Sequence, residues 1–374
     1  MHLNIAIIGY GMAGVAAALH CRELGHRVTH FERNKQPSSS GAGLLLHPPA
    51  QEQLRQLGLL NHALKCGSQI NRISALTSDL EPLLNFSYEQ SNNHRYGLGI
   101  QRAALFQILT NADSGNNKVI YGANITDLDV DNGVLVADQS IRHGPFDLII
   151  IADGTNSLLR EKIQTGVMHR QTPKNAALVG LLDDPDRRIK HQLTQYFKGG
   201  RHLSIWPVGS FSPGAMNIKL TEENKLRQSN TWQATAKTLF PAISSLFEQQ
   251  QSEVQLHTFT YRQVEMKRCV KGRAVIIGDA SHSMSPQLGN GVQLALQDAA
   301  LLATKIKHSS CLETALSKYN LTRPKQLRPY HHASRLLTPL FQSDSKTLAL
   351  FRKSIFTRLL NQPKIQNIAH ELLG

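Results

Sequence analysis

A glycine-rich turn between two apolar segments near the start of the chain constrains its fold more than any other feature. Residues 3–8 form an apolar run long enough for a buried parallel strand, and glycines with the spacing G-x-G-x-x-G follow at 9–14. The alanine- and leucine-rich residues 15–24 favour a helix, and residues 27–31 favour a second strand that ends at Glu32. This order of strand, glycine turn, helix, strand and acid is typical of a Rossmann-like βαβ unit.

Each glycine of the turn has a physical role in such a unit. Gly9 permits the tight turn, Gly11 lets a pyrophosphate approach the backbone, and Gly14 lets the helix lie close to the strand. The phosphates would sit on free N–H groups at the start of the helix, and Glu32 would accept the ribose hydroxyls of an adenosine. The sequence therefore predicts a dinucleotide site; the alternative is a glycine-rich connection that binds nothing.

The composition is that of a soluble globular protein. Of the 374 residues, 41% are hydrophobic and 6% are aromatic, which allows one large core or two fused cores. The four cysteines are far apart and form no C-x-x-C pair, and the histidines show no metal spacing, so we expect neither a metal site nor a disulfide framework. No signal peptide and no apolar run of membrane-spanning length are apparent, so we expect a cytoplasmic protein.

The net charge of +14 indicates anionic ligands or partners. Much of the surplus lies between residues 320 and 364, at Arg323, Lys325, Arg328, Arg335, Lys346, Arg352, Lys353, Arg358 and Lys364. No nucleic-acid-binding signature accompanies these residues, so we expect no nucleic-acid partner. We favour a solvated basic face, and the alternative is a docking face for an acidic protein substrate or partner.

Farther along the chain, β-rich segments interrupt the α/β pattern. Strands are expected at 72–77, 83–88 and 95–98, in a meander over 119–136, at 147–152, in an antiparallel sheet at 176–182, 192–197, 202–207, 215–220 and 254–261, and at 272–277. Helices are expected at 50–57, 101–111, from 157 onwards, and at 231–247, 292–305, 347–360 and 312–337, the last interrupted at Pro324 and Pro329. The nucleotide-binding unit is therefore discontinuous, with a β-rich region inserted into it.

Three predicted strand ends are each followed by a glycine and a helix. They are the turn at 9–14, Asp153-Gly154 and Gly278-Asp279. In an open parallel sheet, ligands bind at the carboxyl ends of the strands, so we expect these three segments to lie together. An aspartate beside a glycine at such an end can hold the hydroxyls of an extended ligand.

With these segments, the chain resembles the flavoprotein monooxygenases of the aromatic-hydroxylase type (group A), which have the para-hydroxybenzoate hydroxylase fold. Residues 153–160 match the D-G-x-x-S-x-x-R motif of that family, and the segment from Gly278 to Asp298 matches its third motif. The resemblance covers residues 3 to about 305. One departure is the loop 289–293, where the family usually has G-Q-G-x-N and this chain has G-N-G-V-Q, so that the two amide residues have changed places.

The resemblance implies an α/β fold: a discontinuous Rossmann-like FAD-binding domain of the GR2 type, an inserted β-sheet substrate domain and C-terminal helices. The FAD-binding domain would comprise residues 1–70, 100–165 and 262–310. The substrate domain would comprise a β excursion at 71–99 and the main sheet at 166–261, and residues 311–374 would be the helical C-terminal region.

The resemblance also implies the residues that hold FAD. By position these are Gly9, Gly11, Met12, Ala13, Gly14, Glu32, Arg33, Gly43, Arg102, Asp153, Arg160, Gly278, Asp279, Pro286, Gly289, Asn290, Gly291 and Val292. Arg102 would reach the pyrophosphate, and Asp279 would hold the ribityl chain. Asp153 and Arg160 would serve the pyrophosphate side and the nicotinamide cofactor, and the helix beginning near Val292 would direct its positive end at the flavin.

The activity implied is the hydroxylation of a small aromatic substrate. NAD(P)H would reduce FAD, and O2 would then form a C4a-hydroperoxyflavin that transfers OH to an electron-rich ring. The catalytic candidates are Pro286, beside the flavin ring, and His47, in the loop after Gly43. The candidates for the substrate pocket are Tyr196, His202, Trp206 and Tyr261, all on the inserted sheet.

Several alternatives use the same fold. One is the same flavin chemistry on a protein side chain, during maturation of a protein-derived quinone cofactor. A second is a flavin-dependent reductase or dehydrogenase, and a third is an FAD-binding protein that acts through a partner. A halogenase is disfavoured because Trp206 and Trp232 do not form the W-x-W-x-I-P segment of that branch. The substrate, the preference for NADH or NADPH and the oligomeric state stay open.

Overall fold

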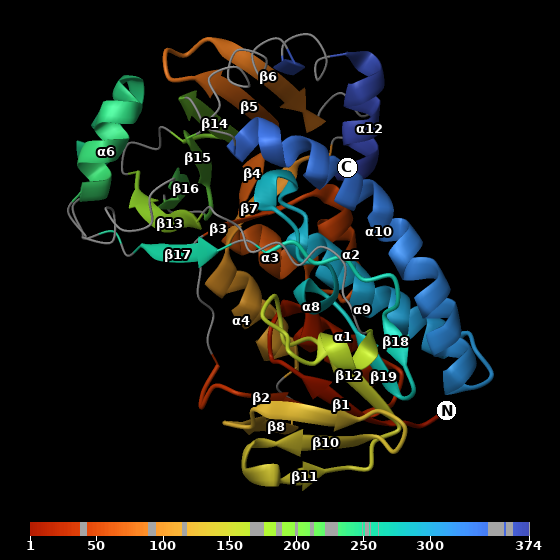
Figure 1. Cartoon of the computed structure of the whole chain (residues 1–374). Coiled ribbons are helices and arrows are strands. Elements are labelled where there is room, and N and C mark those ends of the chain that lie inside the picture. The colour runs from red at the N-terminus through yellow and green to blue at the C-terminus, as the bar shows by residue number, and fades with distance from the viewer. Residues whose placement is uncertain are drawn as a thin grey trace.

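The structure is a computed structural model (Figure 1). It describes residues 1–37, 43–88, 95–113, 118–164, 176–184, 189–198, 201–209, 213–220, 231–248, 250, 254, 256–260, 262–342, 355–356 and 362–373. Within these ranges, no helix is both long enough and apolar enough to span a membrane.

A six-stranded sheet carries the nucleotide-binding part of the chain. Its order is β18 (Val270–Lys271), β19 (Ala274–Ile276), β12 (Leu148–Ile151), β1 (Asn4–Ile8), β2 (Arg27–Glu32) and β8 (Lys118–Tyr121), and every pair except β18–β19 is parallel. The central strands are almost wholly apolar because helices and loops cover both faces of a parallel sheet. This sheet agrees with the predicted α/β class.

Helices cover this sheet and connect it to the rest of the molecule. They are α1 (Met12–Glu23), α2 (Pro48–Gln56), α3 (Leu60–Cys66), α4 (Arg102–Asp113), α5 (Arg160–Ile163), α8 (Asp279–His282), α9 (Gly291–Lys307) and α10 (Leu312–Gln342). Helix α1 packs against α9 and α4, and α10 packs against α9. On the other side of the sheet in Figure 1 lies the meander β9 (Ile125–Asp129), β10 (Val134–Ala137) and β11 (Arg142–His143).

A seven-stranded sheet forms the second layer. Its order is β17 (His257–Thr260), β13 (Ala176–Asp183), β16 (Pro213–Leu220), β15 (Arg201–Pro207), β14 (Gln192–Lys198), β5 (Arg72–Thr77) and β6 (Pro82–Ser87). Helices α6 (Thr231–Leu239) and α7 (Ser244–Glu248) pack on one face of it. The C-terminal helix α12 (Pro363–Leu373) lies beside the β5–β6 edge (Figure 1). It packs against the face of the seven-stranded sheet opposite to α6 and α7. Because β5 pairs with β14, the segments 72–87 and 176–260 contribute to one sheet.

A small sheet joins these two layers. It consists of β3 (Gly43–Leu46), β7 (Gly97–Gln101) and β4 (Ser68–Ile70). At Gly99 a Cβ atom would lie only 2.0 Å from the carbonyl oxygen of Pro207, so β7 and β15 approach too closely for any side chain there.

The structure corrects several expectations about local structure. Strand β8 is not part of the meander: it pairs in parallel with β2 and extends the main sheet. Helix α10 continues through Pro324 and Pro329, because its contacts with α9, β15 and β18 offset the hydrogen bonds that proline removes. The segment 231–247 forms α6 and α7 with a break before Pro241. Among the described residues up to 164, the helix expected from 157 onwards is the single turn α5. The expected helix 347–360 lies outside the described residues except for Ile355 and Phe356.

Candidate functional site

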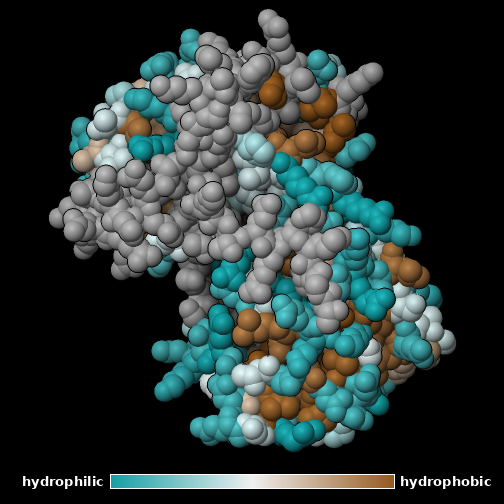
Figure 2. Space-filling view, in the orientation of Figure 1, coloured by the Kyte–Doolittle hydropathy of each residue, from teal (hydrophilic) through white to brown (hydrophobic). Residues whose placement is uncertain are grey.

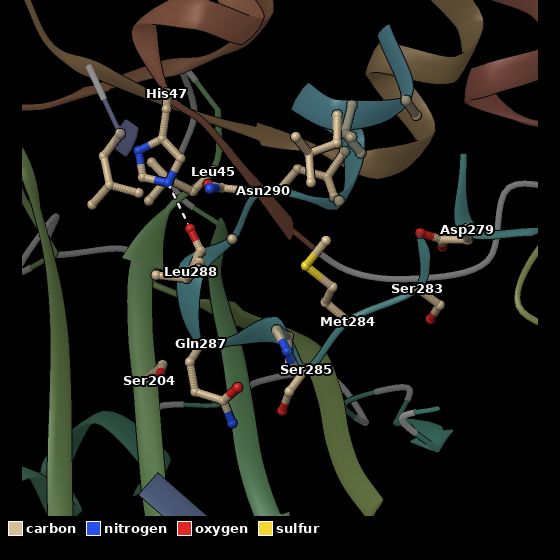
Figure 3. A pocket seen from close by; sticks show the side chains of 18 of the residues that line it. Leu45, His47, Ser204, Asp279, Ser283, Met284, Ser285, Gln287, Leu288 and Asn290 are labelled. Atoms are coloured by element: carbon tan, nitrogen blue, oxygen red, sulfur yellow. Dashed lines mark hydrogen bonds between the residues drawn. The ribbon is translucent and has the colours of Figure 1, made fainter. Parts of the chain in front are cut away.

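A cavity of about 530 Å³ lies between the carboxyl ends of the six-stranded sheet and the inner face of the seven-stranded sheet (Figure 3). All three glycine segments contribute to its wall. The first contributes Gly11, Met12 and Ala13, the second contributes Gly154 and Thr155, and the third contributes Asp279, Pro286 and the run from Gly289 to Val292. The structure therefore brings together segments that are far apart in the sequence, from Gly11 to Val292, as expected for a ligand that crosses the strand ends.

The three glycines of the first turn have different reasons for being glycine. At Gly9, where φ is +102°, a Cβ atom would lie 2.4 Å from the carbonyl oxygen of Ala152. At Gly14 it would lie 2.2 Å from the carbonyl oxygen of Gly9. At Gly11 it would meet no protein atom within 4 Å, although Gly11 lines the cavity. Packing therefore requires Gly9 and Gly14, whereas Gly11 leaves room in which a ligand can approach the backbone.

Glu32 is held in place at the end of β2. One carboxylate oxygen accepts the N–H of Tyr10 at 2.9 Å, and the other accepts the N–H of Asn34 at 2.9 Å. Each oxygen keeps a lone pair for a hydroxyl donor. Glu32 and the exposed Arg33 lie outside this cavity, so they can contact only the part of a dinucleotide that extends beyond it.

Arg102 brings a positive charge into the cavity. It is the first residue of α4, and no hydrogen bond from its guanidinium to another described residue is present. Burial lowers the pKa of Arg102, and the neighbouring Asp279 carboxylate opposes that effect. A guanidinium that is largely removed from water and has no hydrogen-bonded partner in the described chain fits a diphosphate.

The loop between α8 and α9 supplies a second feature that fits a cofactor. The 3-10 turn η5 (Pro286–Leu288) ends at Gly289, whose φ of +67° suits glycine, and α9 begins at Gly291. The side-chain amide of Asn290 is buried beside the cavity, and neither its oxygen nor its nitrogen has a hydrogen-bond partner among the described residues. An unsatisfied amide next to a helix N-terminus matches the polar edge of a flavin, so the residues present fit FAD.

The two exchanged amides of this loop therefore differ in their surroundings. Asn290 lines the cavity, whereas Gln293 is buried within the fold and donates to the hydroxyl of Tyr330 on α10 at 3.4 Å. The shorter amide is the one that a ligand can reach.

His47 is close to the cavity but is occupied by protein partners. Its Nε2–H donates to the carbonyl oxygen of Leu288 at 2.9 Å (Figure 3), and its Nδ1 accepts the hydroxyl of Tyr88 at 2.6 Å. Burial lowers the pKa of His47 to about 4, although the bond to Leu288 opposes that shift. A neutral histidine with both nitrogens engaged positions the η5 loop and is not available as a base in this arrangement.

Arg160 and Asp153 do not line the cavity. Arg160 is 1% exposed, and it donates from Nε to the carbonyl oxygen of Ala280 at 3.0 Å and from Nη2 to that of Thr155 at 2.8 Å. It therefore ties the second glycine segment to the third. Burial raises the pKa of Asp153, while Ser157 and Arg160 lower it. Gly278 is also outside the cavity wall, with a φ of +62° and Ala13 packed against it.

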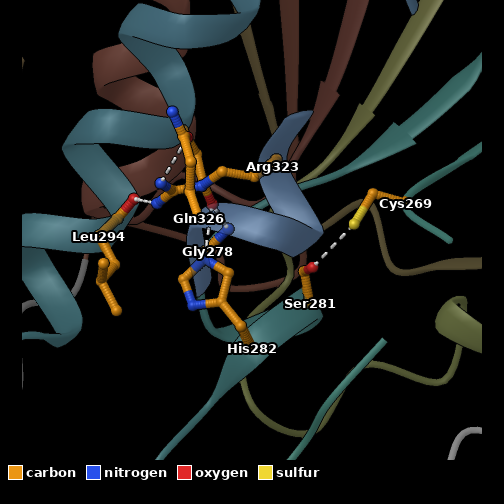
Figure 4. Close-up of polar contacts among 8 residues, drawn as sticks. Cys269, Gly278, Ser281, His282, Leu294, Arg323 and Gln326 are labelled. Carbon is orange, nitrogen blue, oxygen red and sulfur yellow. Dashed lines mark hydrogen bonds and ion pairs between the residues drawn. The ribbon is translucent and has the colours of Figure 1, made fainter. Parts of the chain in front are cut away.

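A buried ionic network supports the third segment (Figure 4), and sequence reasoning missed it. One oxygen of Asp298 accepts the N–H of Gly278 at 2.5 Å and Nε2–H of His282 at 2.7 Å, and the other accepts Nε–H of Arg323. Arg323 also donates to the carbonyl oxygen of Leu294 at 2.8 Å. Burial would raise the pKa of Asp298, but Arg323 and His282 outweigh it and hold that pKa at about 2.

The structure shows that two residues of the expected basic face are not free surface charges. Arg323 is 3% exposed and belongs to the core, and Arg335 forms an ion pair with Glu265. Lys325 and Arg328 are exposed on α10. The surroundings of Lys346, Arg352, Lys353, Arg358 and Lys364 lie outside the described part of the chain. No signal in the sequence distinguishes Arg323 from its basic neighbours.

The candidates for the substrate pocket separate by their position on the seven-stranded sheet. His202 and Trp206 of β15 line the cavity. Tyr196 lies on the other face, where its ring is 6.4 Å from that of Phe240, and Tyr261 is outside the described residues. Sequence reasoning missed several polar residues that line the cavity, among them Gln195, Ser204 and Gln287. Strand alternation could have identified two of them. Ser204 is two residues after His202 and so shares its face of the sheet, and Gln195 is next to Tyr196 and so points to the opposite face from it.

Comparisons with known proteins agree with this geometry. The model of the FAD binding domain family matches residues 2–321. The FAD-dependent urate hydroxylase of Mycolicibacterium vanbaalenii is 25% identical over 345 residues, covering 87% of this chain and 85% of the relative. The aurachin C monooxygenase/isomerase of Stigmatella aurantiaca is 22% identical and covers 97% of this chain and 96% of the relative.

Solved structures share the fold over nearly the whole chain. Klebsiella pneumoniae HpxO in complex with FAD and uric acid superposes with a TM-score of 0.85 at 20% identity, covering 99% of this chain and 96% of that chain. Pseudomonas aeruginosa PqsL in complex with 2-aminobenzoylacetate gives a TM-score of 0.78 at 18% identity, covering 94% of this chain and 100% of that chain. The chain therefore belongs to the FAD binding domain family and is an FAD-dependent monooxygenase of the aromatic-hydroxylase type.

Proposed function

We propose that this monooxygenase uses NAD(P)H and O2 to hydroxylate a small aromatic substrate that binds between η5 and the seven-stranded sheet. One observation carries the proposal: a single cavity is lined by the glycine turn and Arg102 at one end and by His202 and Ser204 at the other. A cofactor and a ring compound bound in this cavity would be in contact. When bound, FAD supplies hydride acceptance and transfer of one oxygen atom from O2.

The residues of the chain have separate tasks in this proposal. Arg102 neutralises the diphosphate, Glu32 holds the adenosine ribose and Asp279 holds the ribityl hydroxyls. The backbone of the Gly289–Gly291 loop and the free amide of Asn290 bind the polar edge of the flavin.

The substrate side is made by both walls of the cavity. Gln195 and Ser204, joined by a hydrogen bond of 3.3 Å, and His202 offer polar contacts from the sheet. Gln287 faces them from η5 with both atoms of its amide unpaired in the described structure. Pro286 is next to Gln287 and closes the cavity beside the expected position of the flavin ring. Trp206 is 8% exposed and helps to exclude water, which strengthens each polar contact.

Relatives and neighbours support the substrate class. The relative from Mycolicibacterium is named a urate hydroxylase, and the solved neighbours contain uric acid or 2-aminobenzoylacetate. These are small ring compounds with several hydrogen-bonding groups, which the polar residues of this cavity can match.

The test is anaerobic reduction of the FAD-loaded protein by NADPH or NADH, alone and with a panel of phenolic and indolic compounds. We expect a substrate to speed flavin reduction at least tenfold, and its hydroxylated product to form when O2 is admitted. His202→Asn should raise the KM of that substrate, whereas His257→Asn, at an exposed position of β17, is the matched control. If FAD binds but no aromatic compound changes its reduction, the proposal fails, and a reductase activity or a protein side chain as substrate becomes the better explanation.

A further inference from the structure

The wall of the cavity changes in polarity along the seven-stranded sheet. Near η5, strands β14 and β15 present Gln195, His202 and Ser204. Toward the other edge, β14, β5 and β6 present Leu193, Ile73 and Phe86, which lie in one row because Leu193 pairs with Ile73 and Ile73 pairs with Phe86. The same face is therefore polar beside the expected flavin position and wholly apolar in this row.

The C-terminal helix forms the opposite wall of this apolar end. Ile365, Ala369 and Leu373 line the cavity, and their spacing of four residues puts them on one face of α12. Ala369 and Leu373 pack with the cluster that contains Phe86 and Leu193. On the outer side of α12, Ile368 is 51% exposed, and Figure 2 shows hydrophobic residues there beside the largely hydrophilic α10.

We propose that the substrate carries an apolar hydrocarbon tail on its aromatic ring, and that the tail lies between the β5–β6 edge and α12. This inference rests on the proposed function, because it assigns a substrate class to the same cavity. The ring would be held at the polar end, where Ser204 and Gln287 face each other across the cavity (Figure 3). A small polar ring without a tail would leave Ile73, Phe86 and Leu373 around water, which is the unfavourable arrangement.

Alkylphenols provide a direct test because the ring stays constant while the tail grows. The dissociation constants of 4-methylphenol to 4-heptylphenol would be measured on the FAD-loaded protein from the change in flavin absorbance. We expect the dissociation constant to fall about threefold per added methylene and then to level off when the apolar end is full. A dissociation constant that is independent of tail length, or that rises with it, overturns the inference.

Two variants at adjacent positions of α12 test whether the substrate tail lies against this helix. Ala369→Phe fills the apolar end and should flatten the series while leaving the affinity for 4-methylphenol within twofold. Ile368→Phe adds the same bulk on the outer face and should leave the whole series unchanged. If the two variants behave alike, the tail does not lie against α12 and the inference fails. The series on the unmodified protein decides the tail specificity even if Ala369→Phe does not fold.

The outcomes also separate this inference from the proposed function. If phenols speed flavin reduction equally with and without a tail, the hydroxylase function stands and the tail specificity is lost. If no phenol of any length binds or changes flavin reduction, both are rejected.

Discussion

The Nε2–H of His47 donates to the carbonyl oxygen of Leu288 at 2.9 Å and so ties the junction between β3 and α2 to the η5 loop in the cavity wall. On the opposite side of the same ring, Nδ1 accepts the hydroxyl of Tyr88 at 2.6 Å. Because the carbonyl oxygen of Leu288 can only accept, the proton of the neutral ring lies on Nε2, and burial favours this neutral form. This protonation state leads to a prediction about pH.

Stability should fall on acidification between pH 6.5 and 4. The pKa of an unfolded histidine is about 6.5, whereas burial lowers the pKa of His47 to about 4. In this window the unfolded chain binds a proton that the folded chain excludes, so the free energy of unfolding decreases as the pH falls. His30, with a pKa lowered to about 3, and His331, with one lowered to about 4, act in the same direction.

Denaturant unfolding at several pH values checks this prediction. His47→Phe should reduce the pH slope of the unfolding free energy by up to about 1.4 kcal/mol per unit. The exposed His62→Gln controls for the loss of a histidine. An unaltered slope in His47→Phe would show that His47 is charged in the folded protein.

Gly11→Ala and Gly14→Ala should affect different properties: Gly11→Ala should weaken FAD binding, and Gly14→Ala should weaken folding. The Cβ atom at Gly14 would lie 2.2 Å from a carbonyl oxygen, so Gly14→Ala should unfold or strongly destabilise the protein. Gly11 has extended backbone angles and open space beside it, so Gly11→Ala should keep its folding stability within about 1 kcal/mol and lose at least tenfold in FAD affinity. Thermal unfolding without FAD and FAD titration measure the two effects. Equal FAD affinity in Gly11→Ala would contradict the proposed position of the diphosphate.

Arg102→Met should weaken FAD binding without weakening the fold. The guanidinium has no hydrogen bond to a described residue, so its loss should leave the unfolding free energy of the FAD-free protein within about 0.5 kcal/mol. The dissociation constant of FAD should rise at least tenfold, and it should depend less on salt than in the unmodified protein. Arg328→Met, at an exposed position of α10, is the control.

Asn290→Leu should stabilise the FAD-free protein or leave it unchanged, because it removes a buried amide without a hydrogen-bond partner in the described structure. It should also lower FAD affinity about tenfold. Gln293→Leu loses the bond to Tyr330 and should weaken the fold while retaining FAD affinity. FAD titration of both variants is the measurement, and the reverse pattern would mean that Gln293 is the residue that reaches the flavin.

Asp298→Asn should be strongly destabilising, by about 3–5 kcal/mol, because it leaves the Arg323 charge buried without its carboxylate. The double variant Asp298→Leu/Arg323→Met should be less destabilised than Asp298→Asn, because no unpaired charge remains. Chemical denaturation of the unmodified protein, Asp298→Leu, Arg323→Met and the double variant gives the coupling free energy. A double variant that shows the sum of both single losses would mean that the two residues act independently.

The sequence by itself determined the nucleotide-binding turn, the α/β class and the convergence of the three glycine segments. These features depend on local rules: glycine spacing, the burial of apolar strands and the fact that parallel strands end at one edge. The family resemblance that these segments carry also implied FAD, which the family match confirms. The domain boundaries and the individual site residues stay predictions.

Only the tertiary structure decided what several side chains do. Arg160, His47 and Arg323 look like ligand-binding or surface residues in the sequence, yet each is buried and bonded to protein atoms from a distant segment. The apolar end of the cavity likewise arises only when β5, β14 and α12 meet. The physical reason is that a side chain's partners depend on which distant segments pack beside it, and spacing along the chain carries no information about that.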